Sequence, residues 1–101
     1  MDYQVKLSLS ARLDIHDIVR YISIDAPDRG LRFGRFLIRH TKSLGHLPER
    51  GRVVPEFDHE SIREIIVRAY RIVYRVDHDH RSIEIIRFWH AGRGSPDILN
   101  D

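Results

Sequence analysis

The side chains best suited to chemistry are three arginines and one histidine in the C-terminal half of the chain. Arg71 lies in the alternating segment 70–76, and strand geometry directs it away from the face that carries the apolar residues. Arg63 lies on the preceding expected strand, His90 ends the last one, and Arg93 follows it. Guanidinium groups bind carboxylates and phosphates through paired hydrogen bonds, and a histidine can transfer a proton near neutral pH. These residue types suit phosphate binding coupled to proton transfer.

The same side chains also have structural roles open to them. Arg71 can form an ion pair with Glu56 or Glu64 across strands. Arg63 can form a charge pair with its neighbour Glu64, and His90 can cap the end of the sheet with a hydrogen bond. The sequence leaves the structural and the functional roles open.

The closest spacing of metal-binding residue types is Asp77-His78-Asp79-His80. It falls in an expected hairpin turn, where polar residues are common, and a metal site usually needs ligands fixed by further contacts. A phosphate-binding glycine loop, a nucleophile elbow and zinc-ligand spacing are missing from the sequence. We therefore expect no metal and no cofactor.

The N-terminal half predicts a strand followed by two helices. Residues 3–9 alternate between apolar and polar types, which indicates a half-buried strand. Ser10 stands where the N-cap of a helix over residues 11–24 belongs. After a break, Pro27 or Asp28 can begin a second helix, with Asp28 as the expected cap and Gly45 as the expected stop. So short a connection predicts an antiparallel helical hairpin.

The C-terminal half predicts strands joined by hairpin turns. Residues 53–57 suit a short extended piece, and residues 62–67, 70–76 and 82–90 suit strands. Strict alternation in the last strand puts Ile83, Ile85 and Trp89 on one face and Ile86 and Phe88 on the other.

The order of these elements predicts one α+β domain over residues 1–101. It consists of an N-terminal strand, a helical hairpin, and a mostly antiparallel sheet of three to four strands. The hairpin covers one face of the sheet. The other face, which carries Arg71, is left for solvent or a partner.

Composition narrows the class of protein. The chain has 101 residues, of which 42% are hydrophobic, as in a globular domain. Its start is unlike a signal peptide, it has no apolar run long enough to span a membrane, and it lacks cysteine, so a cytoplasmic location is expected. The net charge is only +2, yet Lys6 and Lys42 are the only lysines among 17 basic residues. Both phosphate binding and the codon usage of a GC-rich genome account for this excess of arginine.

Several short motifs occur in an order that is specific when taken together: Tyr3-Gln4-Val5, Leu9-Ser10-Ala11 with Asp14-Ile15, Leu47-Pro48 with Gly51-Arg52, Ile62-Arg63-Glu64, Tyr70-Arg71-Ile72-Val73-Tyr74, and Ile85 to Arg93. In these motifs the chain resembles the RelE/ParE toxins of type II toxin–antitoxin systems, and most closely their ParE-like, plasmid-stabilisation branch. The resemblance implies a growth-inhibiting toxin that a cognate antitoxin neutralises. ParE-like members poison DNA gyrase, whereas RelE-like members cleave messenger RNA on the ribosome.

The resemblance also implies roles for the candidate residues. Arg71 and Arg93 match arginines of RelE-type nucleases, with Arg63 and His90 close enough in the expected sheet to join them. Arg93 suits antitoxin or phosphate binding equally. RelE-type nucleases also use lysines before the central strand and a tyrosine after the final arginine, but residues 62–65 contain no lysine and residues 94–99 no tyrosine.

These absences favour a ParE-like action on gyrase. A metal-independent mRNA endoribonuclease and a non-toxic, antitoxin-binding relative are the alternatives. In each case an antitoxin segment is expected to cover the open face or an edge of the sheet.

Overall fold

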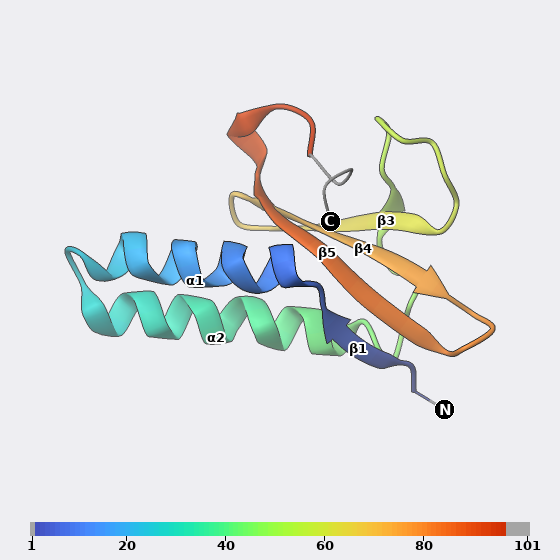
Figure 1. Ribbon diagram of the computed structural model, residues 1–101, viewed down its shortest axis with the longest axis horizontal. Helices are drawn as coiled ribbons and strands as arrows, with labels where there is room; N and C mark the ends of the chain where they lie inside the picture. Colours follow the sequence, from blue (N-terminus) through green and yellow to red (C-terminus); the bar gives the residue numbers. More distant parts are fainter. Residues whose placement is uncertain (1, 97–101) are drawn as a thin grey trace.

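The computed structural model describes residues 2–96, in which two helices lie beside a five-stranded sheet (Figure 1). The elements follow in the order β1 (Gln4–Leu7), α1 (Leu9–Ser23), α2 (Pro27–Ser43), β2 (Arg52–Val53), β3 (Ile62–Val67), β4 (Tyr70–Asp77), β5 (Ser82–His90) and the 3-10 helix η1 (Ala91–Arg93). The strand order is β1-β5-β4-β3-β2, with β1 parallel to β5 and the other pairs antiparallel. The predicted α+β fold is confirmed. The sheet is wider than expected because β1 and the two-residue β2 join it.

Helix α1 begins two residues earlier than predicted. The N-cap is Ser8, whose Oγ accepts a hydrogen bond from the backbone N–H of Ala11 at 3.0 Å. The same hydroxyl donates to the carbonyl of Ile86 in β5 at 2.9 Å. Ser8 therefore caps the helix and also links it to the sheet. Ser10, the cap predicted from the sequence, lies inside the first turn of α1.

Helix α2 starts with Pro27 in its first turn, as predicted, but Asp28 is not its cap. The N-cap is Ala26, which has no side-chain capping bond, and Asp28 lies in the first turn, where its charge favours the helix dipole. The two helices pack closely because Gly34 has no side chain. A Cβ at this position would lie 2.6 Å from Cγ2 of Val19. The helical hairpin is confirmed.

The main core lies between the hairpin and one face of the sheet. Tyr74, at the centre of β4, is fully buried there, and its hydroxyl accepts a hydrogen bond from the N–H of Gly51 at 2.9 Å. The buried residues of this core are Ala11, Ile18, Leu37, Leu44, Ile65, Val67, Ile72, Tyr74, Val76, Ile83, Ile85 and Phe88. The helix-facing side is therefore the apolar row that alternation predicted for β4.

A β-bulge changes the predicted faces of β5. Val73 lies opposite Arg87, but the next residue, Tyr74, lies opposite Ile85. The extra residue inverts the alternation, so Phe88 joins the helix-side core and Ile86 packs with Val73 on the other face. The prediction that placed Phe88 with Ile86 is wrong for this reason.

We expected the second face of the sheet to be open, but part of it is covered. Val54 and Phe57, from the segment after β2, pack on Val73, Ile86 and Ile62 and form a small second core. The segment after β2 thus covers part of the surface that the sequence analysis left for solvent or a partner. Among residues 2–96, no helix combines the length and apolar character that crossing a bilayer requires.

Candidate functional site

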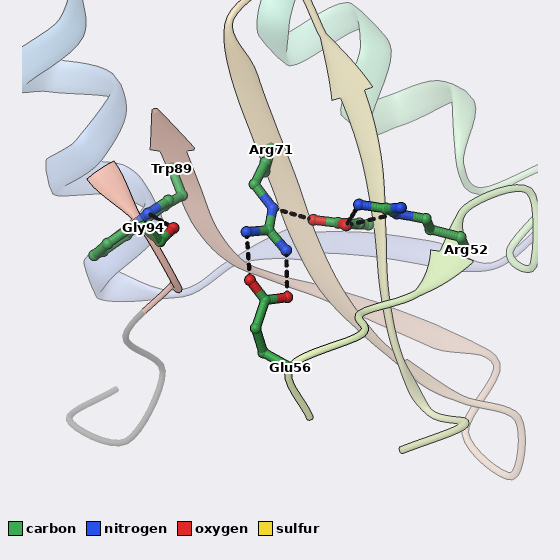
Figure 2. Close-up of polar contacts among 6 residues, drawn as sticks. Arg52, Glu56, Arg71, Trp89 and Gly94 are labelled. Atoms are coloured by element: carbon green, nitrogen blue, oxygen red, sulfur yellow. Dashed lines mark hydrogen bonds and ion pairs between the residues drawn. The ribbon is translucent and has the colours of Figure 1, made fainter. Parts of the chain in front are cut away.

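Arg71 lies on the sheet face away from the helices, as predicted, but two carboxylates hold its guanidinium (Figure 2). Nη1 and Nη2 each donate to a carboxylate oxygen of Glu56 at 2.8 Å, and Nε donates to Oε1 of Glu64 at 2.5 Å. The side chain of Arg71 is only 9% exposed. The ion pairs with Glu56 and Glu64, which the sequence offered as alternatives, are thus both present.

Arg52 completes this ion network from β2. Its Nε donates to Oε2 of Glu64 at 2.8 Å, and its Nη2 forms an ion pair with the same oxygen at 2.7 Å. Glu64, which has no exposed side-chain surface, therefore has a guanidinium on each oxygen. The hydrogen bonds from Arg71 lower the pKa of Glu56 from 4.5 to about 2. Hydrogen bonds from Glu56 and Glu64 raise the pKa of Arg71. The four formal charges cancel.

Arg63 does not join Arg71. It lies opposite Tyr74 in the β3–β4 ladder, so it shares the helix-facing side with Tyr74. Its Nη1 donates to the carbonyl of Gly51 at 3.0 Å, and its Nη2 contacts Glu49 at 3.4 Å. The predicted pair with Glu64 is not formed because adjacent strand residues face opposite sides. In this position Arg63 anchors the segment that leads into β2.

His90 also lies on the helix-facing side, opposite Tyr70 and edge-on to its ring with the centroids 5.3 Å apart. Nδ1 accepts a hydrogen bond from the N–H of Gly92 at 3.0 Å, which caps η1. This bond is the structural role that the sequence offered for His90, and among residues 2–96 it leaves Nε2 without a hydrogen bond. Burial raises the pKa of the Tyr70 hydroxyl, and the nearby Tyr21 adds to this effect.

Arg93 contacts a tryptophan and lines a surface hollow. Its guanidinium lies 4.5 Å from the ring centroid of Trp89, whose Nε1 donates to the carbonyl of Gly94 at 3.1 Å (Figure 2). Trp89 is also the ladder partner of Arg71. The hollow, of about 360 Å³, is lined by Asp14, Asp17, Ile18, Tyr21, Tyr70, Phe88, His90 and Arg93.

The four predicted site residues therefore lie in three separate parts of the structure. Arg71 is held in the ion network on one face, Arg63 anchors a loop on the other, and His90 and Arg93 meet at the hollow beside α1. Sequence reasoning missed Arg52, because its place opposite Glu64 depends on the register of the two-residue strand β2, which lies outside the expected extended piece 53–57. It also missed Asp14 in the hollow, because that contact joins residues far apart in the chain. Within residues 2–96, no group of three or more potential metal ligands comes together.

Comparison with solved structures defines the class of fold. The chain is similar to a chain of the RelBE2 toxin–antitoxin complex from Mycobacterium tuberculosis, with a TM-score of 0.68, 22% identity, and coverage of 89% of this chain and 92% of that one. It is also similar to a chain of the chromosomal ParDE system from P. aeruginosa, with a TM-score of 0.73, 18% identity, and coverage of 87% and 95%. No curated protein sequence matches the chain. The fold is that of the RelE/ParE class.

A sequence-family match defines the family within this class. The model for the ParE toxin of the type II toxin–antitoxin system, parDE, matches residues 5–94. The chain therefore belongs to the ParE toxin family, and the predicted RelE/ParE membership is confirmed.

Proposed function

We propose that this type II toxin inhibits growth by a ParE-like action on DNA gyrase and that a cognate antitoxin neutralises it. The observation that carries the choice of target is the occupied state of Arg71, whose guanidinium is bound by Glu56 and Glu64. The family match over residues 5–94 supports the same choice.

Cleavage of RNA without a metal requires free cations at the scissile phosphate. To serve there, Arg71 would have to leave a bidentate carboxylate and expose Glu64, whose side chain is fully buried. The cost is several kcal/mol, as for any broken buried pair. The ion network itself also offers a phosphate no net positive charge, because Arg52 and Arg71 are balanced by Glu56 and Glu64. Binding to a protein target makes no such demand on Arg71.

Two assays with the purified toxin separate the targets. We expect inhibition of gyrase supercoiling with relaxed plasmid as substrate, and intact messenger RNA after incubation with translating ribosomes. Cleaved messenger RNA with unaffected supercoiling would reverse the assignment. Normal growth of cells that express the toxin without antitoxin would instead identify a non-toxic relative.

The hollow lined by His90 and Arg93 supports endoribonuclease activity as a second candidate function. It combines an imidazole, which can transfer a proton, with an exposed guanidinium and the hydroxyl of Tyr21. If this hollow cleaves RNA, His90→Ala and Arg93→Ala will each abolish cleavage on ribosomes. His80→Ala, which changes an exposed histidine in the β4–β5 turn, is the matched control. Unchanged cleavage in the first two variants would refute this candidate.

The exposed apolar side chains of α1 support a docking surface for the antitoxin. Leu9, Leu13 and Tyr21 of α1 and Ile24, its C-cap, are 74%, 55%, 77% and 76% exposed. A second helix packed along α1 would bury this surface, whereas the helical hairpin covers one face of the sheet and residues 54–57 cover part of the other. We expect Leu13→Glu to weaken capture of the protein encoded by the neighbouring gene by at least tenfold. Capture that is unchanged by this substitution would place the antitoxin elsewhere.

A further inference from the structure

A groove runs between α2 and β3. It borders the ion network, because Arg52 and Glu64 are part of its lining, and it is separate from the hollow at His90 and Arg93. It consists of two adjoining hollows that share Phe36, His40 and Arg50, the larger having a volume of about 550 Å³. Ile65 and Ile66 of β3 line one wall, and Ile66 is 55% exposed. This groove, called here the α2–β3 groove, has an apolar and aromatic floor.

Basic side chains surround this floor. Arg39, Arg50 and Arg68 line the α2–β3 groove, and none of them forms an ion pair within the described part of the chain. The one carboxylate in its lining, Glu64, is already bound by two guanidiniums, one of them from Arg52. The groove is therefore strongly positive although the whole chain carries only +2.

Two features keep cations at the rim. Helical spacing puts Arg32, Phe36, Arg39 and Ser43 on one side of α2, because they stand four, three and four residues apart. Arg68 occupies the left-handed region at φ 57°, where glycine or asparagine is usual, and its guanidinium lies 4.8 Å from the ring centroid of Phe36. The tight β3–β4 turn thus holds an arginine over the aromatic floor at some cost in backbone strain.

We propose that the α2–β3 groove binds the phosphate backbone of single-stranded nucleic acid. Guanidiniums at both sides would contact successive phosphates, and the floor formed by Phe36 would contact a base. An acidic peptide added as a strand fits less well. Only Ile65–Val67 of β3 extend past its pairing with β2, and three residues are at the short end of the usual strand length.

The test measures fluorescence anisotropy of labelled twelve-nucleotide dT and rU oligomers with the full chain over a range of KCl concentrations. With three phosphate contacts on a single strand, the logarithm of Kd should rise with that of the salt concentration with a slope of about 2. We expect Arg39→Gln/Arg50→Gln/Arg68→Gln to weaken binding at least tenfold and to reduce this slope to near zero. A preference for dT or for rU identifies DNA or RNA as the source of the backbone.

A matched variant removes the same charge from other surfaces. Arg12, Arg20 and Arg35 are exposed, two on α1 and one on α2 outside the groove. Their triple glutamine variant should bind within about threefold of the wild type, and both triple variants should keep the wild-type urea midpoint. Equal weakening by both variants, or the absence of oligonucleotide binding, would refute the proposal. So would a polyglutamate peptide that binds the groove more tightly than either oligomer. Gyrase inhibition is measured separately, so failure of one proposal leaves the other standing.

Discussion

The substitution Arg71→Met tests whether the ion network holds the second face of the sheet together. Methionine keeps most of the aliphatic volume but removes the guanidinium between Glu56 and Glu64. The fully buried carboxylate of Glu64 would then retain only Arg52, whose side chain is 61% exposed. Glu56, which is 31% exposed, would be released into water with the segment that carries it.

The expected loss follows from the burial of Glu64. Removing one partner of a buried ion pair costs about 3–5 kcal/mol, because the remaining charge stays desolvated. Since Arg52 still contacts Glu64, we expect about 3 kcal/mol, near the lower end of this range. With a urea m-value of about 1.5 kcal/mol/M, the unfolding midpoint should fall by about 2 M.

Urea unfolding followed by the fluorescence of Trp89 measures this loss, because Trp89 is the single tryptophan and is buried. Arg75→Met is the matched control. Arg75 lies on the same strand, and its pair with Glu84 is about half exposed, so its loss should cost less than about 1 kcal/mol. The double variant Arg71→Met/Glu64→Met should recover most of the stability, because no buried charge is left without a partner. A stability of Arg71→Met within about 0.5 kcal/mol of the wild type would refute this reasoning.

Three further predictions concern other contacts. Because the folded pKa of Glu56 is about 2 against an ordinary 4.5, its carboxylate stabilises the fold above pH 4.5 and loses this effect as the pH falls toward 2. Urea midpoints should therefore fall more steeply over this range in the wild type than in Glu56→Gln, and parallel curves would contradict the prediction. Tyr74→Phe leaves the buried N–H of Gly51 without its acceptor and should cost about 1–3 kcal/mol in the same unfolding assay. Asp14→Ala removes the acceptor of the Phe88 N–H, so hydrogen exchange at Phe88 should accelerate while exchange at the central β4 amides stays unchanged.

Much of the fold could be predicted because local patterns specify it. Alternation located β4, apolar segments between turns located β3 and β5, and the spacing of apolar residues located both helices. The same alternation placed Arg71 on the face away from the helices, and charge complementarity named Glu56 and Glu64 as its partners. These features depend on residue types close together in the sequence, or on strands joined by short turns.

Other features depend on contacts that no local pattern records. The bulge at Val73 and Tyr74 inverts the faces of the end of β5, and Phe88 changes side as a result. Ser8 caps α1 because its hydroxyl also reaches the carbonyl of Ile86, which the sequence cannot show. The four candidate residues were expected on one surface, yet His90 and Arg63 lie on the opposite face from Arg71. The missing tyrosine after Arg93 remains a sequence observation, since residues 97–99 fall outside the described part of the chain.

The contact between α1 and the end of β5 has a consequence for self-association. Strand β1 ends at Leu7, opposite Ile85, so the C-terminal end of β5 lacks a strand neighbour on that side. The carboxylate of Asp14 takes its place, accepting from the N–H of Phe88 at 3.0 Å and from Arg87 at 2.8 and 2.9 Å. A foreign strand would have to displace three hydrogen bonds to add here, so this helix side chain protects the sheet margin from fibre-like growth.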